Sequence, residues 1–261
     1  MLTPDQIAQI AAELDEADRT RTVIPRITAR FPEATVDDAY AIQGRWRDGR
    51  IAAGRTLVGR KIGLTSKAMQ RATGIAEPDY GVMFDDTVFH SGDEIAVERF
   101  SSVRVEVELE FVLKTPLEGP DRTLDDALTA IDHAVPALEV LNSHIELEGR
   151  TIVDTISDNA AYGAMVLGDV RRRPDEIDLR WVPGVLSRGG EIEETGVAAG
   201  VLGHPATGVA WLANKLHQHG ARLEAGEVVL AGSFTRPMWV SRGDDVLCDY
   251  GPMGTISCRF V

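Results

Sequence analysis

Cysteines and long apolar segments are scarce in this 261-residue chain, and each shortage excludes one class of protein. The only two cysteines, Cys248 and Cys258, are too few for a disulfide-stabilised scaffold and form no metal-binding motif. No apolar run approaches the length of a membrane span. Residues 1–5 contain no basic segment followed by an apolar one, so a secretory signal is not expected. We therefore expect a cytoplasmic protein that does not associate with a membrane.

Basic residues are also few, with 27 lysines and arginines against 41 acidic residues and a formal net charge of −14. Such a charge disfavours binding to nucleic acids and to anionic membranes. It does not exclude a small anionic substrate, because a bound cation can reverse the field inside a site. The sequence also lacks three common motifs: a G-x-G-x-x-G after a predicted strand, a P-loop and a G-x-S-x-G.

The most informative stretch spans residues 103–113, where apolar and polar side chains alternate with the period of a β-strand. One face carries only valine, leucine and phenylalanine, and the other carries Glu106, Glu108 and Glu110. Successive carboxylates on that face lie about 6.5–7 Å apart and repel one another. Two interpretations are equally open: an edge strand with a solvated acidic face, or a pair of carboxylates that binds a hard divalent cation.

Glu139 favours the second interpretation, because it is a lone acid within the apolar segment 134–141. A buried carboxylate without a partner is unfavourable, so it needs a metal ion or a base. The alternative is a residue at a strand end that points into water. If Glu139 is instead a ligand, then Glu106, Glu108 and Glu139 together give the minimal carboxylate set for an octahedral Mg²⁺ or Mn²⁺ that keeps positions open for a substrate.

Helical patterns dominate residues 1–55, which are predicted to form a small N-terminal helical subdomain. Thr3 and Thr35 have the sequence context of helix N-caps, and apolar residues follow each of them at helical spacing. From residue 56 onward, short strands and Gly-containing turns dominate, with a hairpin across Gly189-Gly190 and a short helix over 66–73. We therefore predict an α+β protein, mainly β, with a mixed β catalytic domain over residues 56–261.

Lys61 and Asp79 are two further candidates, and each has an ordinary structural explanation. Lys61 lies in an apolar strand, where a lysine usually extends to the surface. Its functional interpretation is a cation that holds a substrate carboxylate or enolate. Asp79 lies in Pro78-Asp79-Tyr80-Gly81, a sequence typical of a turn.

Two polar clusters are candidates for substrate binding. Ser157 and Asn159 fit either a helix cap or a set of oxyanion donors. Ser233, Thr235 and Arg236 follow an apolar strand and precede Pro237, which places them at the rim of a loop. Arg236 could grip a distal carboxylate through two parallel hydrogen bonds, or pair with an acid at an oligomer contact, and the sequence favours neither.

Several segments resemble the hydratase and decarboxylase branch of the fumarylacetoacetate hydrolase superfamily, and they occur in the family's order. They are Gly59–Gln70, Glu77–Gly81, Glu106-x-Glu108, Pro136–Glu139, Asp154–Ala160 and Leu202–Pro205. The resemblance implies a mixed, rolled β-sheet with a small N-terminal helical part, assembled as homo-oligomers such as pentamers or decamers. It also implies that Glu106, Glu108 and Glu139 bind Mg²⁺ or Mn²⁺, whereas Glu110 replaces a small or apolar residue.

The C-terminal segments 193–202, 232–237 and 249–260 most resemble family members that hydrate 2-oxohept-4-ene-1,7-dioate in aromatic catabolism. By this resemblance, the C1 carboxylate and 2-oxo oxygen of a small-molecule substrate would chelate the metal. Lys61 would hold the enolate charge, and Asp79 would act as general acid and base. A 2-hydroxypentadienoate hydratase and a 4-oxalocrotonate decarboxylase are alternatives within the branch, and a non-catalytic metal-binding scaffold is the alternative outside it.

Overall fold

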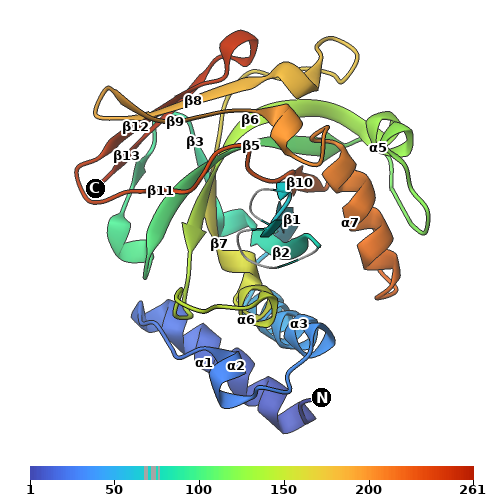
Figure 1. Cartoon of the computed structure of the whole chain (residues 1–261), viewed down its shortest axis with the longest axis vertical. Coiled ribbons are helices and arrows are strands. Elements are labelled where there is room, and N and C mark those ends of the chain that lie inside the picture. The colour runs from blue at the N-terminus through green and yellow to red at the C-terminus, as the bar shows by residue number, and fades with distance from the viewer. Residues whose placement is uncertain (68–69, 72–74, 76) are drawn as a thin grey trace.

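Helices form the N-terminal part of the computed structural model, which describes residues 1–67, 70–71, 75 and 77–261 (Figure 1). The first three are α1 (Pro4–Thr20), α2 (Ile27–Arg30) and α3 (Val36–Ala52). Thr3 and Thr35 cap α1 and α3 through capping boxes, which confirms the two predicted helix starts. The short helix predicted over 66–73 lies partly outside the described residues. No helix among those described is long and apolar enough to cross a membrane.

Most strands belong to a mixed, curled sheet with the order β2-β1-β10-β5-β6-β7-β3, in which β11 also pairs with β5 (Figure 1). The strands are β1 (Leu57–Gly63), β2 (Asp79–Phe84), β3 (Val88–His90), β5 (Val103–Leu113), β6 (Ile131–Asn142), β7 (Tyr162–Leu167), β10 (Val228–Leu230) and β11 (Met238–Trp239). Strands β1 and β10 run parallel, as do β3 and β7. The long antiparallel pair of β5 and β6 forms the centre of this sheet.

A second sheet has the order β4-β13-β12-β8-β9 and lies at the top of Figure 1. Its strands are β4 (Glu94–Ile95), β8 (Pro183–Arg188), β9 (Glu191–Val197), β12 (Asp245–Asp249) and β13 (Thr255–Phe260). The hairpin predicted across Gly189-Gly190 is confirmed as β8 and β9. Val107 of β5 and Ile256 of β13 belong to one hydrophobic core, so the two sheets pack together. The remaining helices are α5 (Leu124–Ala130), α6 (Ile152–Ser157) and α7 (Thr207–His217).

Both faces of β5 are buried, which is inconsistent with the solvated acidic face that the sequence left open. Val105, Leu109 and the other apolar residues of one face lie in the main core. On the opposite face, the exposed fractions of Glu108 and Glu110 are 0% and 3%. Burial of several carboxylates on one strand face is unfavourable unless positive charge lies nearby. The structure therefore favours the cation-binding interpretation of this strand.

The N-terminal helices pack on the rest of the chain through an apolar cluster shared by both parts. Ile10, Ile27 and Ile42 belong to one buried apolar cluster with Ile145, which lies between β6 and α6. The described elements change from helix to strand between Ala52 and Leu57. Division into two domains at residue 55 stays a prediction, and Ile145 shows that the helical core includes a residue from the second part.

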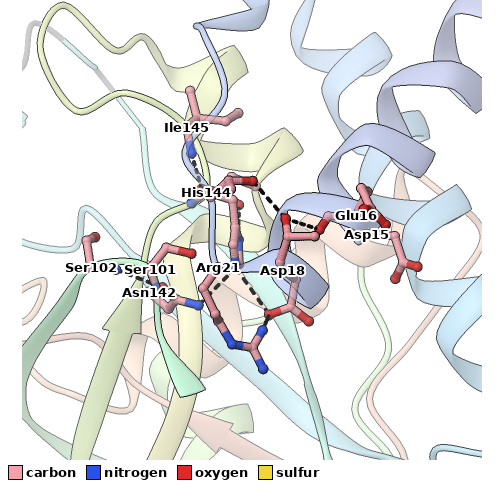
Figure 2. Close-up of polar contacts among 12 residues, drawn as sticks. Asp15, Glu16, Asp18, Arg21, Ser101, Ser102, Asn142, His144 and Ile145 are labelled. Carbon is pink, nitrogen blue, oxygen red and sulfur yellow. Dashed lines mark hydrogen bonds and ion pairs between the residues drawn. The ribbon is translucent and has the colours of Figure 1, made fainter. Parts of the chain in front are cut away.

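His144 links α1 to the segment that follows β6 (Figure 2). Its Nδ1 lies 2.8 Å from Asp158 Oδ1, and its Nε2 lies 3.2 Å from Asp18 Oδ1 and 2.9 Å from Asn142 Nδ2. A protonated imidazole donates from Nδ1 to Asp158 and from Nε2 to Asp18. A neutral imidazole could keep only the proton on Nδ1, and its Nε2 would then accept from Asn142. Burial lowers the pKa of His144, but hydrogen bonds to Asp158 and Asp18 outweigh that effect and raise the pKa to about 9.

We expect this raised pKa to make the folded state less stable in alkaline solution. The contribution of His144 is complete below the unfolded value of 6.5 and is lost as pH rises through about 9. The free energy of unfolding, measured with urea at several pH values across this range, should fall in the wild type and change less in His144→Gln. His133→Gln is a matched control, because His133 pairs with the exposed Asp132. Equal slopes in wild type and His144→Gln would contradict this account.

Candidate metal centre and active site

Strand pairing brings the three predicted metal ligands together. Glu106 on β5 lies directly opposite Glu139 on β6, and Glu108 lies two residues further along the same face of β5. Each of the three offers one carboxylate oxygen, and these oxygens all lie within 4.8 Å of one another. No other group of at least three potential metal-ligating side chains meets this criterion in the part of the chain that the structure describes.

These carboxylates have more acceptor capacity than the surrounding protein satisfies. The backbone N–H of Gly232 donates to Glu108 Oε2 at 2.9 Å, and the Lys61 ammonium lies 3.1 Å from Glu139 Oε1, but the lone pairs of Glu108 Oε1 and most of those of Glu139 are left without a protein donor among the described residues. Burial, with repulsion from Glu139, raises the pKa of Glu106 to about 7 and that of Glu108 well above its usual range. Three converging oxygen ligands with unsatisfied lone pairs suit a hard divalent cation such as Mg²⁺ or Mn²⁺.

Lys61 is buried beside this group, with 3% of its surface exposed, so the surface-lysine interpretation is wrong. Its Nζ lies 3.1 Å from Glu139 Oε1 and donates to the carbonyl oxygen of Ala160 at 3.0 Å. Burial lowers the pKa of Lys61, but Glu139 and Asp79 together raise it above its ordinary value. Strands β10 and β5 separate β1 from β6 in the sheet, so this contact requires the sheet to curl.

The carbonyl that holds Lys61 comes from a short left-handed turn. Asn159, Ala160 and Ala161 have φ angles of 49°, 52° and 59°, a conformation that is unfavourable for residues other than glycine. The side chain of Asn159 fixes the turn to β2, because its Oδ1 accepts from the backbone N–H of Val82 and its Nδ2 donates to the Val82 carbonyl. Asn159 therefore positions the Ala160 carbonyl, and both polar atoms of its side chain are occupied.

Asp79 is the first residue of β2, so its predicted place in a turn is corrected to a buried strand end. It lies opposite Gly63 of β1, where a Cβ would lie 2.2 Å from Asp79 Oδ1. Glycine at this position thus makes room for the carboxylate. Neither oxygen of Asp79 has a hydrogen-bond partner among the described residues. Burial raises the pKa of Asp79, and the nearby Lys61 opposes that effect only in part.

Lys61, Asp79 and Glu106 line one cavity of about 140 Å³. Ser233 and Thr235 line the same cavity. Ser233 Oγ donates to the Val107 carbonyl at 3.3 Å, and Thr235 Oγ1 accepts from the Val107 N–H at 3.3 Å. The two hydroxyls thus tie the loop after β10 to β5.

Neither Ser157 nor Arg236 lines this cavity. Ser157 is the last residue of α6, and its buried hydroxyl has no hydrogen-bond partner among the described residues. The side chain of Arg236 is 78% exposed, and its Nη2 lies 2.9 Å from Glu194 Oε1. The structure therefore does not bring Arg236 to the carboxylates, and a role for it in substrate binding stays a prediction.

Two cavity-lining cations escaped the sequence analysis. Arg104 and Arg150 line the same cavity as Lys61 and Glu106. Arg104 could have been found from the alternation of β5, because it lies on the same face as Glu106 and two residues before it. Arg150 lies just before α6, and no periodicity in the sequence places it near β5.

No family model matches this chain, but several known proteins are similar to it over almost its whole length. The chain belongs to the hydratase and decarboxylase branch of the fumarylacetoacetate hydrolase superfamily, a branch of enzymes. It is 54% identical over 258 residues to the 2-oxo-hept-4-ene-1,7-dioate hydratase of Escherichia coli, covering 97% of each chain. It is 33% identical over 260 residues to the 4-oxalocrotonate decarboxylase of Pseudomonas sp. strain CF600, covering 100% of this chain and 98% of that one.

Solved structures place the fold in the same superfamily. The 4-oxalocrotonate decarboxylase from Pseudomonas putida G7, complexed with magnesium and adipate, matches with a TM-score of 0.98 and 34% identity, covering 100% of this chain and 99% of that one. Fumarylpyruvate hydrolase from Pseudomonas aeruginosa matches with a TM-score of 0.61 and 18% identity, covering 79% of this chain and 89% of that one, which shows a shared fold. The predicted α+β class with a rolled sheet is thereby confirmed.

Loss of one triad carboxylate should abolish tight metal binding. We expect Glu106→Gln to weaken Mn²⁺ binding by more than about tenfold, because a neutral amide replaces a charged ligand. Glu110→Gln is the matched control, because Glu110 lies on the same strand face but outside the triad. Titration of chelator-treated protein with Mn²⁺, followed by electron paramagnetic resonance, measures both affinities. Unchanged affinity in Glu106→Gln would contradict the assignment.

Proposed function

We propose that this protein is a divalent-metal-dependent hydratase that converts 2-oxohept-4-ene-1,7-dioate, through its 2-hydroxy-2,4-diene form, into 4-hydroxy-2-oxoheptanedioate. The observation that carries this proposal is the 54% identity to the Escherichia coli hydratase across 97% of both chains. Such a reaction needs charged groups close to the substrate. The three glutamates of the triad supply them together with Lys61 and Asp79, and all five lie in or beside one cavity.

Decarboxylation of 4-oxalocrotonate is the second candidate. It is supported by the TM-score of 0.98 to the Pseudomonas putida G7 decarboxylase, whose structure contains magnesium and the six-carbon diacid adipate. Both reactions stabilise negative charge on the 2-oxo oxygen, so the charged groups alone do not separate them. The higher sequence identity favours the hydratase.

Glu106, Glu108 and Glu139 would hold the cation, with Mg²⁺ or Mn²⁺ as the ions that fit three oxygen ligands and a substrate chelate. Such a cation would supply positive charge that favours binding of the substrate's C1 carboxylate and development of the enolate. Lys61 lies against Glu139, lines the cavity and adds a fixed positive charge to this site. Its hydrogen bond to the Ala160 carbonyl holds the ammonium group in place.

Asp79 is the proposed proton carrier. Burial raises the pKa of its carboxyl group, which keeps the protonated form populated at higher pH and allows it to donate. Protonation of the dienol at C5, with loss of the 2-hydroxyl proton, gives the 2-oxo-3-ene, and one water molecule then adds its hydroxyl group to C4 and its remaining proton to C3. The proton released from the 2-hydroxyl group replaces the one that Asp79 donates, so the net reaction consumes one water molecule and no other reagent.

The polar residues around the cavity would orient the rest of the substrate. Ser233 and Thr235 line the cavity, and their hydroxyls are fixed to the backbone of β5. Asn159 would act from behind the wall, by holding the turn that carries Ala160, and Ser157 ends the helix that leads into this turn. We assign all four to substrate positioning.

We also propose that the chain assembles as a homo-oligomer, either a pentamer or a decamer. Ile192, Trp239 and Leu247 are large apolar residues on β9, β11 and β12 that remain exposed in the single chain. Exposed apolar side chains of this size are common where subunits meet. Sedimentation velocity at several protein concentrations measures the assembly. A cytoplasmic location stays a prediction.

One assay separates the candidate reactions. The loss of dienol absorbance is followed with the five-carbon monoacid, the six-carbon diacid and the seven-carbon diacid side by side, and the products are analysed for CO₂. The proposed function requires the highest kcat/KM for the seven-carbon diacid without CO₂ release. Stoichiometric CO₂ from the six-carbon diacid would instead establish the decarboxylase.

Removal of the proposed proton carrier should change the pH dependence of turnover. If the protonated carboxyl donates, kcat/KM should decline as pH rises through the raised pKa of Asp79. Asp79→Asn should lose about 10²–10⁴-fold in kcat and lack this alkaline decline. Asp85→Asn is a matched control, because Asp85 is an exposed carboxylate directly after β2 that accepts a hydrogen bond from the backbone N–H of Thr56. A parallel decline in wild type and Asp79→Asn would assign the proton transfer to another group.

Lys61→Met should impair catalysis and also weaken the metal-free fold. The substitution removes the buried cation beside Glu139 and leaves carboxylates unpaired, which typically costs about 3–5 kcal/mol. We expect a large loss of kcat together with a lower melting temperature, part of which Mg²⁺ should restore. Normal turnover in Lys61→Met, measured with saturating Mg²⁺, would exclude Lys61 from the reaction.

A further inference from the structure

We propose that Arg104 and Arg150 form the subsite that binds the second, distal carboxylate of the substrate. This inference rests on the proposed function, because only a diacid has a carboxylate to place there. Both arginines line the cavity that Lys61, Asp79 and Glu106 also line.

The first observation is the position of Arg104 along β5. Arg104 and Glu106 lie on the same face of this strand, two residues apart, which corresponds to about 6.5–7 Å. A seven-carbon chain with six C–C bonds of about 1.5 Å extends for about 7.5 Å between its terminal carbons. A diacid whose C1 end lies at the triad therefore has the length to bring its C7 carboxylate beside Arg104.

The second observation is the lack of a neutralising acid. Among the described residues, neither Arg104 nor Arg150 has a carboxylate oxygen within 4.0 Å. Both instead donate to the neutral hydroxyl of Ser143, Arg104 Nη2 at 2.8 Å and Arg150 Nη1 at 3.2 Å. Two guanidinium groups that share one neutral acceptor repel each other, so an added anion would stabilise the pair.

The other buried arginines show that this arrangement is unusual within the chain. Of the three arginines that are buried in the described residues, Arg50 pairs with Asp15 and Asp18, and Arg60 pairs with Glu227. Arg104 is 8% exposed, and its buried Nε has no hydrogen-bond partner among the described residues.

The third observation is that the guanidinium of Arg104 is held in place before any ligand arrives. Its Cζ lies 5.2 Å from the ring centroid of Trp239, which faces it on the neighbouring strand β11. The stacked ring and the Ser143 hydroxyl fix the planar group on two sides. A preorganised fork loses little entropy when it forms two parallel hydrogen bonds with a carboxylate.

Arg236 is less suited to this role. It pairs with Glu194 through both Nε and Nη2, and it does not line the cavity. A carboxylate would have to displace Glu194 from Arg236, whereas Arg104 and Arg150 have no acid to displace. The structure therefore moves the predicted recognition of the distal carboxylate from Arg236 to the pair on the cavity wall.

The test compares a diacid with a monoacid in Arg104→Gln and Arg150→Gln. With Mg²⁺ present, each substitution should raise KM for the seven-carbon diacid by about 10–100-fold, the loss expected for charge-assisted hydrogen bonds. The KM for the five-carbon monoacid should change by less than about threefold, because it has no group at this subsite. Arg180→Gln is the matched control, since Arg180 forms an exposed ion pair with Asp178.

Equal losses on both substrates in both variants would show that the arginines only brace the Ser143 segment, and an unchanged KM for the diacid would also overturn the proposal. A selective loss in Arg236→Gln, with none in the other two, would return the role to Arg236. Because Arg104 is buried, Arg150→Gln supplies the result if Arg104→Gln does not fold.

A binding experiment separates this inference from the proposed function. Calorimetric titration of the Mg²⁺-loaded protein with 2-oxoheptanedioate and with 2-oxopentanoate measures the subsite without turnover. If the wild type does not hydrate the seven-carbon diacid, the proposed function fails. The subsite is still supported if Arg150→Gln weakens binding of the diacid alone, and it is overturned if both ligands keep their affinity.

Discussion

The concentration of buried negative charge at the junction of β5 and β6 is the constraint on which the rest of the structure depends. Glu106 and Glu139 face each other across two paired strands, and Glu108 lies beside them. Like charges directly opposite each other destabilise a sheet. Lys61 supplies one positive charge at 3.1 Å from Glu139, which leaves the group negative overall and suited to a divalent cation.

Two backbone features that are unfavourable in most proteins place these charges. The left-handed turn at Asn159–Ala161 directs a carbonyl at Lys61, and Gly63 leaves space for the carboxylate of Asp79. Strained backbone of this kind persists only where the surroundings hold it in place. Here the paired hydrogen bonds between Asn159 and Val82 hold it.

The helical N-terminal part is connected to the same turn through His144. Asp158, which binds His144, immediately precedes the left-handed residues, while Asp18 on the other side of the imidazole belongs to α1 (Figure 2). Packing of α1 and the position of the Ala160 carbonyl therefore share one polar connection. This gives the N-terminal helices a physical link to the cavity although none of their residues lines it.

The sequence by itself determined the elements and the chemistry of their side chains. Alternation along residues 103–113 predicted a strand with its acids on one face, and the threonines before α1 and α3 predicted where those helices begin, because both signals depend on neighbouring residues. Only the tertiary structure decided which distant groups meet. Curling of the sheet buried Lys61 against Glu139, and strand pairing placed Asp79 at a buried strand end rather than in a turn. The same packing left Arg236 outside while Arg104 and Arg150 came together, because contacts between segments far apart in the chain depend on how the sheets pack, which no local pattern encodes.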